Sequence, residues 1–404
     1  MFNRTTKIFN YWMRLLFKKE SKFVTLDHFI ANHPNNAAII TSNREETFCC
    51  AEQTSFNYAH IAQKGRTVDC FVALLKNASC FAFSDLIILS DGSYYCEIKT
   101  DPILGKSSDC NDGFILRRDG KYSHYTDIPK KAVRLSSGIL LSGLFSWNYY
   151  HYTFQIIPKV QWISMIPPSV PLLVEDKVED IPSFAELLKI CNKQNRPIFV
   201  METKVRYIVD ELYYISTQTF LEPNHKKGTR YPEVRCFYKP STLEFLRQTI
   251  IPVASEIREK FPNRIYLGRK YASSRRKFNE DECIDCAKEF GFEVVYPELL
   301  SLQQQVALFN NAEMIVGGSG AAFTNLVYCK EGVFVLVLAK FYPNLGLWQS
   351  IVDYLHGKLA YVLETDSIND IPSDPHVPFT IDISRLKKSL QYLVQEKALL
   401  APKN

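Results

Sequence analysis

The chain has 404 residues, of which 46% are hydrophobic and 23% are charged, and its formal net charge is +5. This length is too great for one ordinary hydrophobic core and predicts two domains of roughly 150–200 residues each. The charge bias is too weak to indicate a nucleic-acid-binding protein, although it is compatible with anionic substrates or an anionic membrane surface.

Residues 1–20 alternate aromatic and aliphatic side chains with lysine and arginine at roughly helical spacing. A basic amphipathic helix with aromatic anchors can lie in the interface of an anionic bilayer. A helix packed on its own domain, or a frayed terminus, is the alternative. The chain has no run of 18 apolar residues, so we expect no membrane-spanning helix.

The cysteines indicate a reducing compartment. There are 11 of them, an odd number without a regular framework, and no secretory signal peptide precedes them. We therefore expect a cytoplasmic protein, with peripheral attachment to the inner face of the plasma membrane as an open alternative. Cys283 and Cys286 have Cys-x-x-Cys spacing, but they fall inside a predicted helix without a second pair, so we interpret them as structural.

The amino-terminal portion is predicted to be β-rich, because residues 46–130 are rich in Phe, Tyr, Val and Ile. Asp91 and Gly92 separate two apolar runs and predict a β-hairpin. Further along, Asn148 is expected to cap a helix that carries His151 and ends near Pro158. Strands are then predicted at 170–174, 198–201 and 211–215, and helices at 183–192 and 241–260.

The last third of the chain alternates strands and helices with a regular rhythm. Strands are predicted at 264–267, 292–296, 314–316, 333–338 and 359–363, and helices at 281–290, 301–310, 324–329 and 345–356. This alternation indicates a parallel, doubly wound sheet with helices on both faces. Such sheets bind ligands beyond the carboxyl ends of their strands.

Residues 312–325 are the most informative stretch. An apolar run breaks into a glycine-rich turn and then resumes, which predicts a buried strand, a tight turn and the start of a helix. The amides of such a turn, together with the positive end of the helix dipole, form a site for an anion such as a diphosphate. The alternative is a turn whose glycines serve close packing alone. The turn residues are Gly317, Gly318, Ser319, Gly320 and Ala321.

Basic residues follow the predicted strand that ends at Leu267, and they include Arg269 and Arg275. Their loop lies on the same rim of the sheet as the glycine turn, and the guanidinium group is a rigid fork suited to phosphate oxygens. A solvated basic loop is the alternative.

The candidates for acid–base chemistry are polar residues in the first turns of two predicted helices. Asn279 and Glu282 have the spacing of a capping pair, which leaves Glu280 to bind a sugar hydroxyl, orient an arginine or act as a base. His151 could be a general base, because its intrinsic pKa suits neutral pH, or a hydrogen-bonded core residue. The acidic stretch 175–180 lacks the arrangement of a metal–nucleotide site and is interpreted as a solvated loop.

These motifs, taken in order, resemble family 61 glycosyltransferases. The resemblance rests on the residues from Arg269 to Glu282, on the run from Gly317 to Asn325, and upstream on the Asn-Tyr-Tyr-His segment that ends at His151. It covers roughly residues 65–365 and is densest from 264 to 330.

The resemblance implies an α/β, GT-B-like fold of two facing Rossmann-like domains with parallel sheets. It also implies an inverting transferase that uses a nucleotide sugar and needs no bound metal. We expect a basic amphipathic segment at 1–30, an acceptor-side domain at 31–261 and a nucleotide-sugar-binding domain at 262–404. The donor-binding residues would be Arg269, Arg275, Asn279, Gly317, Gly318, Ser319, Gly320, Ala321 and Asn325.

One position departs from the family pattern. Many relatives have histidine in place of Ser319, so a contact from Ser319 to the donor phosphates would be made by a hydroxyl group and be weaker. The first choice for the catalytic base is His151 and the second is Glu280. A non-catalytic binding or scaffold protein, and a polysaccharide pyruvyl transferase of the same architecture, are the alternatives.

Bacterial members of the family are often associated with capsule or lipopolysaccharide assembly, and the reduced-looking cysteines with no signal segment favour this type. We therefore expect a glycan or lipid-linked glycan acceptor and no nucleic-acid partner. The sugar, the nucleotide and the linkage depend on the shape of the side chains around the site, which the sequence does not specify.

Overall fold

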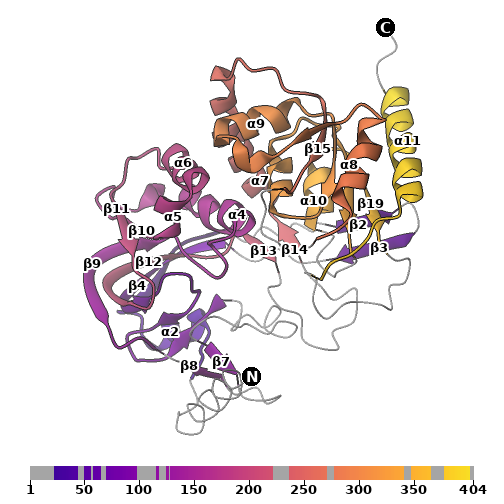
Figure 1. Ribbon diagram of the computed structural model, residues 1–404. Helices are drawn as coiled ribbons and strands as arrows, with labels where there is room; N and C mark the ends of the chain where they lie inside the picture. Colours follow the sequence, from indigo (N-terminus) through magenta and orange to yellow (C-terminus); the bar gives the residue numbers. More distant parts are fainter. Residues whose placement is uncertain are drawn as a thin grey trace, which may run out of the picture.

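The computed structural model describes residues 22–43, 50–55, 58–64, 70–97, 115–117, 124–126, 128–221, 236–270, 277–340, 347–364 and 377–400. Two large sheets organise these residues (Figure 1). The first is built from the amino-terminal half and the second from the last third of the chain. The expected α/β architecture with parallel strands is confirmed, whereas the expected domain boundaries stay a prediction.

The first sheet is mixed. In the described residues its order is β11-β10-β9-β12-β4-β5-β6, and β1 also pairs with β4. Strands β9 to β12 run parallel, while β1, β4, β5 and β6 add antiparallel pairings. Only part of this sheet is therefore parallel, which differs from the parallel sheet expected for this half. The bounds are β1 Ala37–Asn43, β4 Cys70–Cys80, β5 Ile87–Ile88, β6 Tyr94–Tyr95, β9 Ala132–Leu140, β10 Leu172–Glu175, β11 Ile198–Met201 and β12 Arg206–Ile215.

The hairpin predicted at Asp91-Gly92 is confirmed. Strands β5 and β6 pair antiparallel on either side of it. The Asp91 carboxylate accepts hydrogen bonds from the amide and the hydroxyl group of Ser93, at 2.9 and 2.6 Å. Gly92 has a φ of +83°, a backbone conformation that side chains oppose and glycine allows.

A continuous helical segment follows the first sheet's β9 and changes its winding. It begins as α4 (Tyr149–His151), widens to the π-helix η2 (Tyr152–Ile156) and tightens to the 3₁₀-helix η3 (Ile157–Met165). Asn148 caps it as predicted, since its side-chain oxygen accepts a hydrogen bond from the Tyr150 amide at 2.9 Å. Pro158 does not end the helix, because it lies in the first turn of η3, where no amide donor is needed.

The remaining elements of the first half lie outside its main sheet. The acidic stretch 175–180 was predicted to be a solvated loop, and this prediction is wrong. Glu175 ends β10 with its side chain fully buried, and Lys177–Asp180 form helix α5. Burial raises the pKa of Glu175 to about 7. The other elements are α2 Leu26–Asn32, β2 Cys50–Ser55, β3 Tyr58–Lys64, β7 Ile115–Arg117, β8 His124–Thr126 and α6 Pro182–Cys191.

A short hairpin connects the two halves of the chain. Strands β13 (Thr219–Leu221) and β14 (Cys236–Tyr238) pair antiparallel. They lead into α7 (Pro240–Ile250) and η4 (Ile251–Glu256). In Figure 1 this hairpin and α4 lie between the two sheets.

The second sheet is parallel throughout, as predicted, with the order β16-β15-β17-β18-β19. Its strand order reverses between β15 and β17, and a ligand site is expected at the carboxyl ends of these two strands. The bounds are β15 Arg264–Leu267, β16 Glu293–Val295, β17 Met314–Gly318, β18 Phe334–Ala339 and β19 Lys358–Leu363.

Helices cover both faces of the second sheet. Helices α8 and α11 lie on one side and α9 on the other (Figure 1). Cys283 and Cys286 of α8 are buried and free, in agreement with a structural role. The helix predicted at 324–329 is instead the 3₁₀-helix η6, which begins at Ala321. The bounds are α8 Glu280–Lys288, η5 Pro297–Leu299, α9 Leu302–Asn311, η6 Ala321–Tyr328, α10 Leu347–Tyr354 and α11 Ile383–Leu400.

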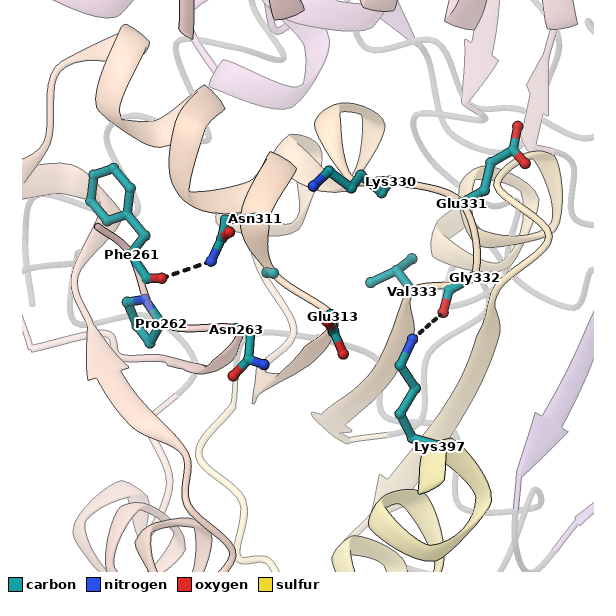
Figure 2. A pocket seen from close by; sticks show the side chains of 11 residues that line it. Phe261, Pro262, Asn263, Asn311, Glu313, Lys330, Glu331, Gly332, Val333 and Lys397 are labelled. Atoms are coloured by element: carbon teal, nitrogen blue, oxygen red, sulfur yellow. Dashed lines mark hydrogen bonds between the residues drawn. The ribbon is translucent and has the colours of Figure 1, made fainter. Parts of the chain in front are cut away.

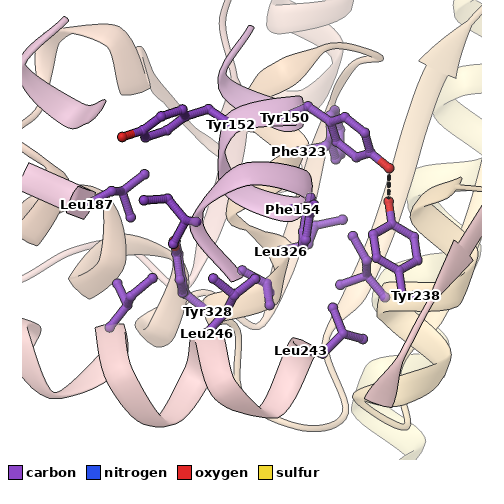
Figure 3. Close-up of a cluster of buried hydrophobic side chains, with 14 of the residues drawn as sticks. Tyr150, Tyr152, Phe154, Leu187, Tyr238, Leu243, Leu246, Phe323, Leu326 and Tyr328 are labelled. Carbon is purple, nitrogen blue, oxygen red and sulfur yellow. Dashed lines mark hydrogen bonds between the residues drawn. The ribbon is translucent and has the colours of Figure 1, made fainter. Parts of the chain in front are cut away.

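The two halves share one apolar core. Figure 3 shows Tyr150 and Phe154 of the α4–η2 segment beside Phe323 and Leu326 of η6, with α7 packed below them. The hydroxyl groups of Tyr150 and Tyr238 lie 2.5 Å apart within this core. Because these side chains are buried from both sides, the segment that carries His151 is held against the helix that follows the glycine turn.

Candidate functional site

The site predicted at the carboxyl edge of the second sheet is assembled by strand register. Leu267, the last residue of β15, pairs with Gly317 of β17. The chain leaves both strands at this point, so the segment beginning at Gly268 and the turn at Ser319 lie side by side. This is the point at which the strand order reverses.

Arg269 connects the two loops. Its Nη1 atom donates a hydrogen bond of 2.6 Å to the Ser319 carbonyl oxygen. Its backbone amide donates a hydrogen bond of 2.9 Å to the Glu280 carboxylate. Arg269 is partly exposed, so its charge lies at the surface of this edge, beside the glycine turn.

The contact of Glu280 with the Arg269 amide agrees with the second of the three roles considered for it, the positioning of an arginine. Burial raises the pKa of its carboxyl group, and the hydrogen bond from the Arg269 amide and the charge of Arg269 oppose this shift. The carboxylate thus holds the loop through the backbone. This attachment leaves Glu280 less suited to act as a base.

The first two glycines of the turn serve close packing, which was the alternative interpretation. Gly317 and Gly318 belong to β17 and are paired with neighbouring strands. A Cβ atom on Gly317 would lie 2.9 Å from the carbonyl oxygen of Leu267, and one on Gly318 would lie 2.8 Å from the Phe278 ring. The predicted donor contacts of these two residues are therefore not supported by their positions.

Gly320 and Ala321 retain the geometry of an anion site. Gly320 is extended and precedes the first residue of η6, and no side chain caps this helix. The first amides of a helix have no acceptor within it, and they carry its positive partial charge. A Cβ atom on Gly320 would lie 2.8 Å from Arg269 Nη1, so the guanidinium group lies directly beside these amides.

Ser319 faces the interior instead of the anion site. Its side chain is buried, its amide donates to the Leu338 carbonyl, and its hydroxyl group accepts a hydrogen bond of 3.3 Å from Trp348 Nε1. The expected contact of its hydroxyl group with donor phosphates does not fit this orientation. The reason is the indole of α10, which lies behind the turn.

The two asparagines predicted to bind the donor are occupied by protein groups. Asn279 stands at the start of α8 without capping it; its amide pairs with the backbone of Ile381 and contacts Glu282. Asn325 is fully buried, and its amide accepts from the Tyr149 hydroxyl group and donates to Gln305. These hydrogen bonds indicate that both asparagines stabilise the fold.

His151 lies on the other side of the interface between the two halves. Its ring packs against Phe145 and Tyr150, with centroids 5.2 Å away in each case. Burial lowers its pKa to about 4, and a hydrogen bond with Gln155 opposes this shift. The imidazole is therefore neutral at neutral pH and can accept a proton.

Hydrogen bonds define which ring nitrogen of His151 is free to accept a proton. The Gln155 amide nitrogen donates to the Thr219 carbonyl at 3.2 Å, which turns the Gln155 oxygen toward His151 Nδ1 at 2.7 Å. An amide oxygen only accepts, so Nδ1 carries the hydrogen and Nε2 has the lone pair. In this tautomer Nε2 is the nitrogen that can take a proton.

Side chains link His151's helix to the glycine turn. Tyr149 donates a hydrogen bond of 2.8 Å to Asn325 in η6. The Tyr150 ring packs edge-on against Trp348, with centroids 5.7 Å apart, and Trp348 binds Ser319. The helix that begins at Tyr149 is thus attached to η6 and, through Trp348, to the glycine turn, although these elements are separated in sequence.

No role was predicted for Gln155 or Trp348 in these contacts. Gln155 lies four residues after His151, the spacing at which helical side chains meet, and this signal could have identified it. Nothing in the local sequence links Trp348 to Ser319. Two predictions, the contact of Arg275 with the donor and the membrane helix at 1–20, lie outside the described residues.

Two pockets of the described residues lie at the opposite edge of the second sheet. One has a volume of about 730 Å³ and is lined by residues at the amino ends of the strands, including Asn263, Glu313 and Val333. Figure 2 shows Lys330 and Lys397 at this pocket, with Lys397 donating to the Gly332 carbonyl. A second pocket shares Lys330 and Asn311 with it. None of the predicted site residues lines either pocket.

Two further findings concern the described residues alone. They contain no group of three or more His, Cys, Asp or Glu side chains placed to hold a metal ion. None of their helices is long and apolar enough to cross a membrane.

Comparison with protein families identifies the region that holds these residues. Residues 149–336, a little under half of the chain, match the family described as Glycosyltransferase 61. The matched region begins at α4 and ends in β18, so it includes His151, Arg269 and the glycine turn. The match supports a family 61 glycosyltransferase, and the expectation of a glycosyltransferase enzyme is confirmed. A search of curated proteins finds no match.

Proposed function

We propose that this glycosyltransferase is an inverting, metal-independent enzyme that moves a sugar from a nucleotide-sugar donor to a glycan acceptor. The two sheets would correspond to the two domains of a GT-B-like arrangement, with the donor on the second. The family match is the premise of this proposal. The observation that carries it is the hydrogen bond from Arg269 to the Ser319 carbonyl, which holds a cation beside the first amides of η6.

The donor diphosphate would bind Arg269 and the amides of Gly320 and Ala321, and Arg275 is a further candidate from the sequence. A guanidinium group and helix amides are suited to phosphate oxygens, because both present N–H donors to a negative charge. As the bond between the sugar and the diphosphate breaks, negative charge grows on the leaving oxygen. Donors that are already oriented toward this oxygen stabilise it.

The acceptor would be activated by His151. Its Nε2 atom would take the proton of the acceptor hydroxyl group while that oxygen attacks the anomeric carbon from the face opposite the diphosphate. The new glycosidic bond forms as the old bond breaks, which inverts the configuration. Gln155 would stabilise the resulting imidazolium by accepting a hydrogen bond from Nδ1. Glu280 would act indirectly, by positioning Arg269.

The acceptor class and the location form a further part of the proposal. We propose a cell-surface polysaccharide or its lipid-linked precursor as the acceptor, as in bacterial capsule or lipopolysaccharide assembly. The enzyme would work on the cytoplasmic face of the plasma membrane, with residues 1–20 at the lipid surface. The basic amphipathic pattern of these residues supports this contact. Flotation with anionic vesicles, compared for the full chain and a chain lacking residues 1–20, tests it.

Ligand-dependent thermal stability tests the donor proposal. The protein is heated with UDP, GDP, CDP, ADP or dTDP, each with and without a chelator. At least one nucleotide should raise the melting temperature, and the chelator should not reduce the effect. Arg269→Ala should abolish the effect. The absence of stabilisation by every nucleotide would contradict the proposal.

Turnover separates a transferase from a binding protein. The nucleotide sugars of the stabilising nucleotide are incubated with the protein, and slow release of the nucleotide is followed. Release that is lost in Arg269→Ala supports the transferase. Stabilisation by a nucleotide without release from any of its sugars, even with a mixed glycan acceptor, would instead indicate a non-catalytic binding protein.

A further inference from the structure

An exposed tryptophan lies on the loop that leads into the helix of His151. The Trp147 side chain is 48% exposed, whereas Trp348 is buried and Trp162 is partly buried with its Nε1 atom bound to Gln218. A large aromatic ring open to water has an unfavourable hydration free energy that burial or a ligand would relieve. A ligand that covers the ring would relieve this cost.

The loop holds this ring in a defined position. Phe145 lies two residues before Trp147 and has a φ of +61°, which is a strained conformation for a bulky residue. The Leu144 amide donates a hydrogen bond of 3.2 Å to Asp85, and the Asn148 amide donates one of 2.8 Å to the Phe145 carbonyl. The loop is thus tied down on both sides of the exposed ring.

Phe145 relates this ring to His151. Its ring packs against Trp147 at an interplanar angle of 79° with centroids 6.4 Å apart, and against His151 with centroids 5.2 Å apart. An edge-to-face contact covers at most one face of the indole. The Phe145 ring therefore contacts both Trp147 and the proposed base, and indole surface is left for a ligand.

The size and chemistry of this surface favour a sugar ring. A single indole flanked by Ser146 and Asn148 is too small an apolar surface for a protein partner. The C–H groups on one face of a pyranose are apolar and carry a slight positive charge, and the face of an indole carries the negative part of its quadrupole. A pyranose ring and an indole also match in area.

We propose that Trp147 is the stacking platform for a pyranose ring of the acceptor saccharide, and that it presents a sugar hydroxyl group to His151. The role as acceptor platform rests on the proposed function, whereas the binding of a saccharide at Trp147 does not. Trp147 acts by binding and takes no part in proton transfer.

Kinetic constants test the acceptor role with three variants. Trp147→Ala should raise the KM for the acceptor glycan at least tenfold, while the KM for the donor should change less than twofold. Trp147→Phe retains an aromatic face and should recover part of the acceptor affinity. Tyr392→Ala is the matched control, because Tyr392 is 46% exposed on α11, away from the site, and it should behave like the wild type.

Fluorescence quenching tests the binding directly and does not depend on turnover. The difference in acrylamide quenching between the wild type and Trp147→Phe reports Trp147 alone. Hexasaccharides of glucose, of galactose and of N-acetylglucosamine are titrated, and at least one should protect Trp147 at millimolar concentration. If none protects it, the inference is overturned.

The two tests separate the failure of the inference from that of the proposed function. A protein that turns over a donor, but in which Trp147→Ala leaves the acceptor KM at the wild-type value, contradicts the inference alone. A protein that turns over no donor, but whose Trp147 is protected by a saccharide, contradicts the proposed function and retains the saccharide site.

Discussion

The two edges of the second sheet differ in shape and in chemistry. The amino edge has a pocket of about 730 Å³, lined by Lys330, Lys397 and Glu313. The carboxyl edge has the Gly320 turn, with Arg269 held beside the first amides of η6. The open pocket is thus at one edge and the oriented cation and amides are at the other.

The direction of the chain explains why backbone donors gather at the carboxyl edge of a parallel sheet. Helices that follow parallel strands begin at the carboxyl edge, so their unpaired amides and positive dipole ends gather there. The amino edge receives the ends of helices and has no such donors. The orientation of the backbone therefore favours the carboxyl edge for an anion.

The largest expected effect concerns His151. We expect His151→Ala to lower turnover by about 10²–10⁴-fold, the range that general base catalysis contributes. In the wild type the acid limb of kcat/KM should lie near the lowered pKa of about 4, well below the pKa of an ordinary histidine. A pH–rate profile checks both points. His28→Ala, on the exposed face of α2, is the control.

The same pKa predicts the effect of acid on stability. His151 is neutral in the folded protein and protonates more readily when unfolded. Its contribution to stability is therefore present above the unfolded pKa of roughly 6.5 and is lost as the pH falls through about 4. Near-normal turnover in His151→Ala would exclude His151 as the base.

The comparison of the two edges is tested directly by Arg269→Ala and Lys330→Ala. The first change should weaken nucleotide binding about 100-fold, because it removes an oriented charged donor from the proposed diphosphate site. The second removes a charge of the same sign from the amino-edge pocket and should change the affinity less than twofold. Isothermal titration with the stabilising nucleotide measures both. A reversal of these effects would place the donor site in the amino-edge pocket.

The carboxyl edge of the first sheet can be compared with that of the second, because it has a buried carboxyl group. Glu175 ends β10, and burial raises its pKa to about 7. The protonated Glu175 carboxyl group stabilises the folded protein most below the pKa that this group has in the unfolded chain. This stabilisation is lost as the pH rises through about 7. Glu175→Gln should therefore raise the free energy of unfolding by about 2–3 kcal/mol at pH 8 and much less at pH 4.

Urea unfolding at the two pH values measures this difference. Glu179→Gln is the control, because Glu179 is exposed on the neighbouring helix α5. An equal effect of Glu175→Gln at both pH values would show that the carboxyl group is not titrating in this range.

The smallest expected effects concern two glycines of the turn, one of which should affect nucleotide affinity and the other stability. In Gly320→Ala the new methyl group would displace the flexible end of Arg269, so nucleotide affinity should fall about tenfold with little change in stability. In Gly317→Ala the methyl group would meet the backbone of Leu267, so the unfolding free energy should fall by about 1–3 kcal/mol. Titration and urea unfolding of both variants check the distinction. Equal losses of affinity would contradict it.

The sequence predicted the second sheet more completely than the first. Strand 264–267 and strand 198–201 were predicted with the observed ends, because short apolar runs bounded by turn residues have little freedom in length. The mixed pairing around β4 was not predicted. The partner of a strand is chosen among segments far apart in the chain, and the local pattern is the same for a parallel and an antiparallel pair.

The residue pattern established the chemical types and their order: a glycine turn after a buried strand, an arginine after the neighbouring strand, and a histidine behind a capping asparagine. Which of these groups meet became known from the packing of the chain. Trp348 turns Ser319 inward, Tyr149 occupies Asn325, and Glu280 holds the backbone of Arg269. The reason is that the direction of a side chain depends on partners brought near by packing, which residue spacing along the chain does not encode.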